Sequence, residues 1–235
     1  MKKQIRTLLG VALLCAAMSP AMFASDNAYL YLLQGIPGHD YSSSTDPQFP
    51  VDILLNGEVC YQRGLGFGVI TGPLTFAPGS YDVKISIADS VAPCTNEPVV
   101  DTTVTLNAGE NESLVLTFGS TGSAETVGFN NSFASVSAGN ARIQFAHAAD
   151  ATAVTLTLKN TSTQKSYTYT VNPGQLLGET LPAATYDVTV TQGSTTLVST
   201  TSVTLDSQSV ELMYIVGEAG NNTVNLETKS VKNVI

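Results

Sequence analysis

Hydrophobic and polar residues alternate over short segments along most of the chain. Apolar residues occupy every second position in residues 81–88, 154–159 and 186–191. A period of two predicts β-strands with one face in a core and the other in water. Residues 28–33 and 212–216 are apolar on both faces, as in strands at the centre of a packed sheet. No segment after residue 24 keeps a period of 3.6, so we expect short helices or none.

Turn signals separate the predicted strands. They are Asn56-Gly57, Pro78-Gly79, Ala108-Gly109, Pro173-Gly174 and Gln192-Gly193. Such pairs favour tight chain reversals because glycine tolerates backbone angles that other residues avoid. Many short strands joined by turns predict an all-β protein.

The same features recur in the same order in the two halves of the chain. Residues 27–28 match 140–141, residues 51–56 match 154–159, residues 74–83 match 181–188, and residues 104–106 match 203–205. Four matches in one order indicate an internal duplication. With about seven predicted strands in each half, the pattern favours two tandem immunoglobulin-like antiparallel β-sandwich domains.

The repeat and the local composition place the boundaries. We predict a signal peptide at residues 1–24, a first sandwich at 25–119, a linker at 120–139 and a second sandwich at 140–235. The linker is rich in Gly, Ser and Asn, although residues 126–129 have the pattern of a further strand.

The first residues have the pattern of a Sec-type signal peptide. A basic start is followed by an apolar stretch at residues 8–18 and by Ala24, after which we expect cleavage. The apolar stretch is shorter than the ~20 residues that span a bilayer. The alternatives are an anchoring helix and lipid attachment at Cys15, which Leu14 disfavours. We expect an exported protein without a membrane span in the mature chain, either periplasmic, attached to the cell surface or secreted.

Export makes the chain more acidic. The sequence has ten Lys and Arg against nineteen Asp and Glu, and loss of residues 1–24 removes three basic residues and no acidic ones. The formal net charge then changes from −9 to −12. An acidic surface repels nucleic-acid phosphates and anionic lipids, so we expect no nucleic-acid partner.

The cysteines agree with export. The mature chain keeps Cys60 and Cys94, and an even pair in an oxidising compartment favours one disulfide. The alternative is a reactive thiol, which needs a positioned His.

Several motifs resemble a known family. They are residues 141–151 with Ala153-Val154 in the second half, and residues 34–38, 50–52, 56–57, 64–72 and 78–83 in the first. These motifs are similar to the bacterial domain-of-unknown-function family 4397, most strongly in residues 27–119. The resemblance implies exported β-sandwich modules, often in tandem, in the envelope or outside the cell, and it implies no activity. The second half lacks the cysteine pair and has Ala183-Ala184-Thr185 where the first has Pro78-Gly79-Ser80.

His147 and Asp150 are the polar pair that most suggests chemistry. A His and a carboxylate at a strand end can act as an acid–base pair or as half of a metal site. The equivalent position in the first half is Gln34, and the other histidine of the chain is His39. We therefore favour a hydrogen bond that closes the corner between strand and loop, and we leave any further role of the pair open.

Residues 35–50 form a long predicted loop, and long loops often carry function. His39, Asp40 and Asp46 are the candidates for a functional surface on it. Together with Asp52 they could gather a cation, but a calcium site needs six to eight oxygens and the spacing fits no calcium loop. We predict no metal and no cofactor.

Catalytic signatures are weak. The segment Gly64-Leu65-Gly66-Phe67-Gly68 is not followed by a predicted helix that could hold a phosphate, so we interpret its glycines as a bend or bulge in a strand. The chain has no GxSxG motif.

Tyrosines have structural interpretations. Tyr81 and Tyr186 each follow a turn and precede Asp-Val, which predicts tyrosine corners that pin a strand to a neighbouring loop. Two further pairs could form platforms for sugar rings, although the chain has no Trp and cross-strand packing explains them equally. These residues are Tyr29, Tyr31, Tyr167 and Tyr169.

The expected function is interaction without catalysis. We predict a non-enzymatic exported module for interaction, adhesion or scaffolding, whose partner is an envelope or surface protein or a glycan. Its loops or its strand edges would carry the contact. The first alternative is a soluble carbohydrate or small-molecule binder. The second is an extracytoplasmic hydrolase with a carboxylate pair drawn from Asp40, Asp46, Asp52 and Glu58.

Overall fold

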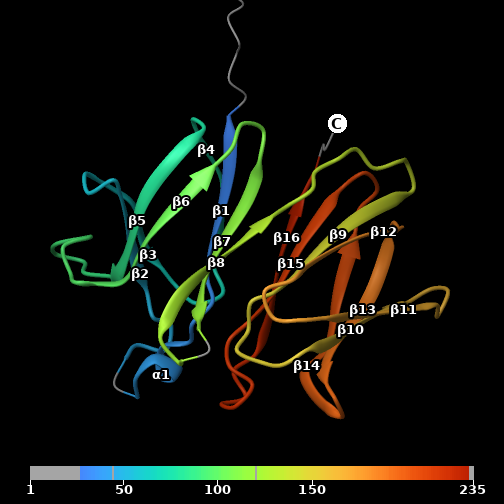
Figure 1. Ribbon diagram of the computed structural model, residues 1–235. Coiled ribbons are helices and arrows are strands. Elements are labelled where there is room, and N and C mark those ends of the chain that lie inside the picture. Colours follow the sequence, from blue (N-terminus) through green and yellow to red (C-terminus); the bar gives the residue numbers. More distant parts are fainter. Residues whose placement is uncertain (1–26, 44, 120, 233–235) are drawn as a thin grey trace, which may run out of the picture.

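The computed structural model describes residues 27–43, 45–119 and 121–232. The predicted signal peptide at residues 1–24 and Cys15 lie outside the described residues. Within them the chain forms sixteen strands and one short helix, arranged as two sandwiches (Figure 1). The predicted all-β fold class is confirmed. No helix among these residues is long and apolar enough to cross a membrane.

Strands β1 to β8 build the first sandwich. Its inner sheet has the order β4 (Ile70–Phe76), β1 (Ala28–Gln34), β7 (Asn111–Phe118) and β8 (Ala124–Asn130). Its outer sheet has the order β3 (Val59–Leu65), β2 (Val51–Leu55), β5 (Gly79–Ile87) and β6 (Pro98–Leu106). The helix α1 (Gly38–Tyr41) is a single turn in the connection from β1 to β2.

Strands β9 to β16 build the second sandwich. Its inner sheet has the order β12 (Leu176–Pro182), β9 (Asn140–His147), β15 (Val210–Val216) and β16 (Asn225–Val231). Its outer sheet has the order β11 (Ser166–Val171), β10 (Val154–Asn160), β13 (Ala184–Gln192) and β14 (Thr195–Leu205). Each strand of the second sandwich has the same position in its sheet as the strand of the first sandwich whose number is lower by eight, so that β9 corresponds to β1 and β16 to β8. The duplication inferred from the sequence is therefore a duplication of topology, and the two tandem sandwiches are confirmed.

One strand pair in each sandwich departs from the predicted antiparallel arrangement. β1 runs parallel to β7, with Tyr29 opposite Asn111 and Gln34 opposite Leu116, and β9 runs parallel to β15. The other strand pairs are antiparallel. A parallel pair requires a long crossover connection. Here the intervening strands provide it, because the chain passes through the outer sheet before it returns beside β1.

The connection between the sandwiches is shorter than the predicted linker at residues 120–139. Residues 124–130 form β8, which pairs with β7 from Phe118 opposite Ala124 to Glu112 opposite Asn130. Glycines 119 and 122 lie in the β7–β8 hairpin, where the Gly122 nitrogen donates to the Gly119 oxygen over 2.8 Å. The strand pattern at residues 126–129 therefore belongs to the first sandwich.

Each sandwich encloses an apolar core made by the inward positions of both its sheets. In the first, Leu30 and Leu32 of β1 meet Ile53 and Ile85 of the outer sheet. In the second, Ile143 and Phe145 of β9 take the corresponding positions. The alternation read from the sequence is thus the alternation between core and solvent.

A third apolar core joins the two inner sheets face to face. Tyr31, Leu33 and Val115 of the first sandwich pack in one cluster with Leu212 and Tyr214 of the second. The inner strands are therefore covered on both faces, which explains why residues 28–33 and 212–216 are apolar throughout. Across this core, the hydroxyls of Ser113 and Tyr214 lie 2.5 Å apart. The two sandwiches consequently form one body of four stacked sheets.

Both predicted tyrosine corners are confirmed. The Tyr81 hydroxyl donates to the carbonyl of Ala77 over 2.6 Å, and the Tyr186 hydroxyl donates to the carbonyl of Pro182 over 2.9 Å. Each bond spans four residues and ties the start of β5 or β13 to the chain before it. The two tyrosine hydroxyls therefore hold the turn before β5 and the turn before β13 in the same way.

Candidate functional site

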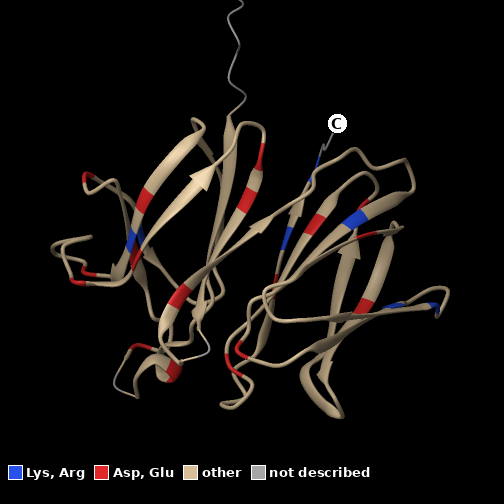
Figure 2. Cartoon of the chain, in the orientation of Figure 1, with Lys and Arg blue, Asp and Glu red and all other residues tan. Residues whose placement is uncertain are grey.

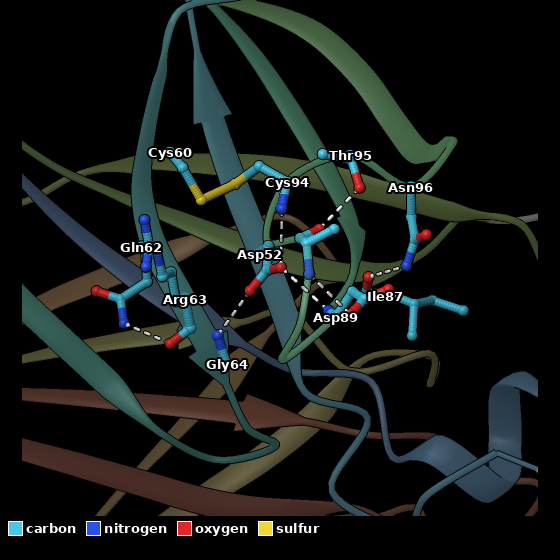
Figure 3. The surroundings of a disulfide bond; sticks show 11 residues. Asp52, Cys60, Gln62, Arg63, Gly64, Ile87, Asp89, Cys94, Thr95 and Asn96 are labelled. Atoms are coloured by element: carbon cyan, nitrogen blue, oxygen red, sulfur yellow. Dashed lines mark hydrogen bonds between the residues drawn. A yellow bond between two sulfur atoms is a disulfide. The ribbon is translucent and has the colours of Figure 1, made fainter.

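The predicted disulfide joins Cys60 of β3 to Cys94 in the connection from β5 to β6 (Figure 3). Their Cα atoms are 5.7 Å apart, and the bridge closes a segment with a sequence separation of 34. It links the outer edge strand of the first sandwich to a segment without strand structure.

Asp52 of β2 lies beside the disulfide and holds both neighbouring segments (Figure 3). Its carboxylate accepts backbone N–H groups from Gly64 at 2.9 Å, Cys94 at 3.0 Å and Asp89 at 3.2 Å. The residue is 1% exposed. A buried carboxylate requires such partners to offset its lost hydration. Asp52 was a candidate for hydrolysis, but its position is that of a structural anchor.

Residues 35–50 form a packed connection. Ile36 and Phe49 are fully buried, and Tyr41 stacks on Phe49 with ring centroids 4.6 Å apart. The buried side-chain amide of Gln34 donates to the carbonyls of Ile36 and Phe49, each over 2.8 Å, and accepts the Ile36 N–H. The two ends of the loop are thereby fastened together at the end of β1.

The three candidate residues on this connection have different surroundings. His39 is exposed. The Asp40 carboxylate turns to the second sandwich, where it accepts from Asn221 over 3.2 Å and from the hydroxyl of Thr223. Asp46 accepts the N–H of Gln48 over 2.8 Å and so caps its own turn. In the part of the chain that the structure describes, no three His, Cys, Asp or Glu side chains are close enough to hold a metal ion.

His147 closes a corner at the end of β9, as the sequence predicted. Its Nε2 atom lies 2.9 Å from the Thr152 carbonyl, so this nitrogen carries the proton. Burial lowers the pKa of His147, and hydrogen bonds to backbone groups oppose the change. Gln34 at the end of β1 performs the same task in the first sandwich. Asp150 is exposed, and it takes part in the loop through its backbone, which bonds to Gly217 over 2.9 Å.

Tertiary structure brings four carboxylates from three connections to one end of the molecule, which we call the acidic end: Asp40, Asp46, Asp150 and Glu218. Burial and then the nearby carboxylates of Asp40 and Asp150 raise the pKa of Glu218. The Glu218 carboxylate also accepts from Asn221 over 2.7 Å. Figure 2 shows acidic segments and no basic ones at this end of the described chain. The acidic end therefore joins both sandwiches in one negative surface.

Two grooves border the acidic end. One, of about 480 Å³, lies between residues 150–152 and 218–220 and also touches Gln192. The other, of about 460 Å³, lies between the sandwiches, with the β7–β8 hairpin on one side and residues 147–152 on the other. A third groove of about 440 Å³ lies beside Asp52 and Arg63 in the first sandwich.

The tyrosine pairs do not form platforms at these grooves. Tyr31 is 2% exposed in the core between the sandwiches, while Tyr29 is 37% exposed. Tyr167 and Tyr169 of β11 pack on the core of the second sandwich. The linings of the three grooves contain no tyrosine. Their packing agrees with the structural interpretation of these residues.

Sequence reasoning missed Glu218. No spacing in the sequence marks it, and its position follows from strand pairing: Gly119 and Gly217 each follow the strand that runs parallel to the first strand of their sandwich. Two parallel strands run in the same direction, so the residues that follow β15 lie at the same end of the sheet as those that follow β9. Glu218 therefore lies beside residues 148–153, and the packing of the two sandwiches brings it near Asp40.

Three solved structures are similar to the chain at low identity. The C-terminal domain of AlgF from P. aeruginosa is 21% identical, covers 41% of this chain and 98% of its own, and has a TM-score of 0.27. The Bacillus anthracis TIE protein is 15% identical over 80% of this chain and 33% of its own, with a TM-score of 0.26. A candidate cell adhesion protein from Bacteroides ovatus is 7% identical over 89% and 98%, with a TM-score of 0.30. These scores are too low to bear on function.

The comparison with curated proteins found no match. The family described as "Domain of unknown function (DUF4397)" matches residues 41–157, from α1 through the core between the sandwiches to β10. This match confirms the resemblance found in the motifs of the sequence. Over these residues, the chain belongs to the DUF4397 family.

Proposed function

We propose that the protein is a non-enzymatic exported interaction module that presents its acidic end to a partner in the cell envelope or at the cell surface. One observation carries this proposal: loops from both sandwiches meet there, and Asp40 ties them together through Thr223 and Asn221. A surface made of fixed loops loses little conformational entropy when it binds.

The disulfide supports export. Disulfides persist in oxidising compartments and are rare in the cytosol. The bridge between Cys60 and Cys94 therefore agrees with the signal-peptide pattern of residues 1–24. Periplasm, cell surface and culture medium are distinguished by protease treatment of intact cells that carry a tag after Ile235, with the culture supernatant tested beside them.

Charge favours a partner whose contact surface is basic. The acidic end has four carboxylates, and Figure 2 shows the Lys and Arg residues of the described chain on other segments. Complementary charge speeds association and selects partners, and salt screens it. Binding through this surface is thus expected to weaken as the salt concentration rises.

The test uses intact cells of the producing strain from which the gene has been deleted. It measures how much of the purified mature protein these cells retain. The double variant Asp150→Asn/Glu218→Gln removes two carboxylates from the acidic end. The matched control Glu58→Gln/Glu97→Gln removes two exposed carboxylates from connections of the outer sheet. We expect retention to fall at least about fivefold for the first variant and to stay unchanged for the control. Equal retention of both variants at every salt concentration would contradict the proposal.

A second candidate function is the binding of a carbohydrate. The groove between residues 150–152 and 218–220 has hydroxyl, amide and carboxylate groups, which suit sugar hydroxyls. In it, Gln192 donates to the Thr152 hydroxyl over 2.5 Å. A glycan that binds the mature protein and loses affinity with Gln192→Ala would favour this candidate over a protein partner.

We also propose that the protein has no hydrolase activity. Of the four carboxylates considered for hydrolysis, Asp52 and Asp46 are bonded to backbone N–H groups and Asp40 to Thr223. Glu58 is exposed in the turn between β2 and β3. A panel of polysaccharides and esters tests this point, and turnover that disappears with Asp46→Asn would overturn it.

A further inference from the structure

The strand β14 forms the free edge of the outer sheet in the second sandwich. Within the described residues it pairs with β13 on one side and with no strand on the other. It spans Thr195–Leu205, eleven residues, and is the longest of the described strands. An edge strand exposes a row of unpaired backbone N–H and C=O groups that can pair with another strand.

β14 lacks the residues that usually protect an edge. It contains no charge, no Pro and no Gly over its whole length. The counterpart β6 in the first sandwich carries Pro98 and Asp101, and Asp101 forms an ion pair with Lys84 over 3.1 Å. Charged or proline residues also interrupt most other edges, namely β3 (Arg63), β4 (Pro73), β8 (Glu125), β12 (Glu179) and β16 (Lys229). The uncharged β11 is shorter, with six residues, and follows Lys165.

The centre of β14 is symmetric in sequence. Residues 198–203 read Val-Ser-Thr-Thr-Ser-Val in both directions. An antiparallel strand pair with a two-fold axis between positions 200 and 201 therefore sets Val198 opposite Val203, Ser199 opposite Ser202, and Thr200 opposite Thr201. Matched β-branched and hydroxyl pairs are favourable across antiparallel strands.

A bulge makes this symmetry compatible with the sheet. In a regular strand, Val198 and Val203 would point to opposite faces because they are five positions apart. Here β13 residues 188 and 190 pair with Thr201 and Val198, so β14 has one extra residue between them. Val198 and Val203 are both buried in the core, and the four residues between them are exposed. The two valines that would face each other across the two-fold axis thus lie on the same face of the sheet.

Charges flanking β14 permit the same pairing. Asp206 follows the strand and forms an ion pair with Lys232 over 2.8 Å. In the two-fold arrangement Asp206 would lie opposite Thr195 of the other copy, so no like charges would meet.

We propose that two copies of this chain associate through antiparallel pairing of their β14 edges about the centre between Thr200 and Thr201, which joins the two outer sheets into one. The bulge bends each strand, so the pairing is expected to be centred on residues 198–203. Such a small contact gives a weak dimer, with a dissociation constant of roughly micromolar or above. The inference is independent of the proposed function, although a dimer would present two acidic ends and bind with avidity.

Sedimentation equilibrium of the mature protein from about 1 to 500 μM tests association. Thr200→Lys introduces a charge at the centre of the edge, and we expect it to raise the dissociation constant at least about tenfold. The matched control is Thr168→Lys, also an exposed threonine but in β11 at the other edge of the same sheet, and it is expected to change nothing. Circular dichroism and thermal melting show that both variants fold. A chain that stays monomeric at 500 μM, or equal effects of the two variants, would overturn the proposal.

Cysteine cross-linking tests the register separately. In the proposed pair, position 199 of one copy faces position 202 of the other. A mixture of Ser199→Cys and Ser202→Cys chains should therefore form a disulfide dimer under mild oxidation, at least about tenfold faster than either chain alone. A mixture of Ser199→Cys with Thr196→Cys is the out-of-register control. Equal rates in the two mixtures would refute this register.

Discussion

Glu211, near the start of β15, is a buried acid, and we expect it to make the free energy of unfolding depend on pH. The residue is 4% exposed, and its Oε2 atom has no hydrogen-bond partner among the described residues. Burial raises the pKa of Glu211 to about 7, against hydrogen bonds from Ser230 and Thr228 that lower it, and Asp206 adds to the rise. The protonated form is thus the one that the folded protein favours.

The size of the effect follows from the difference between the folded and unfolded pKa. A rise from 4.5 to about 7 corresponds to roughly 3 kcal/mol, because one pKa unit is worth about 1.4 kcal/mol. The folded state binds the proton more tightly, so this contribution to the free energy of unfolding is fully present below pH 4.5. It is lost as the pH rises to about 7. Glu211→Gln carries a neutral amide at every pH and has no such loss.

Urea unfolding of both proteins at several pH values between 4.5 and 8.5 measures the effect. We expect Glu211→Gln to unfold with a free energy close to that of the wild type at low pH, and to exceed it by roughly 3 kcal/mol at pH 8. Glu97→Gln, which removes an exposed carboxylate from the first sandwich, controls for net charge. A difference between Glu211→Gln and wild type that does not grow with pH would refute the reasoning.

Three further predictions concern the packing. Replacement of Cys60 and Cys94 by Ser should lower the free energy of unfolding by about 3–4 kcal/mol in the chain-entropy estimate for a separation of 34 residues, measured by urea unfolding. Leu212→Ala empties a fully buried position in the core between the sandwiches and should cost about 2–5 kcal/mol. Calorimetry of this variant should show both sandwiches destabilised, and loss confined to the second would contradict a shared core. Tyr186→Phe leaves the Pro182 carbonyl without its hydroxyl donor and should cost about 1–3 kcal/mol, whereas an unchanged melting temperature would contradict the role of the corner.

Much of the fold could be predicted because its signals are local. Strand positions follow from the alternation, since each strand has one face in a core. The tyrosine corners at Tyr81 and Tyr186 follow from a turn and a short motif, and each bond spans four residues. The match of Gln34 with His147 came from the repeat, and both side chains fasten loops at the ends of equivalent strands.

The candidate site was predicted in its parts and not in its assembly. His39, Asp40 and Asp46 lie on the connection singled out in the sequence, but Asp40 faces Thr223, which is 183 positions away. Glu218 lies near Asp40 and Asp150 because the connections that carry these three residues lie at the same end of the stacked sheets. No spacing along the chain encodes that meeting, which depends on how one sandwich packs on the other.

The sequence by itself determined the strands, the duplication, the disulfide partners and the corners, because each depends on short-range pattern or on counting two cysteines. Only the tertiary structure decided the parallel pairs, the third core and the acidic end. The apolar residues throughout 28–33 and 212–216 indicate strands that are buried on both faces, but the pattern does not show what covers the second face. The covering surface is the other sandwich, and its choice depends on the shape and free energy of two whole faces, a property that no segment carries alone.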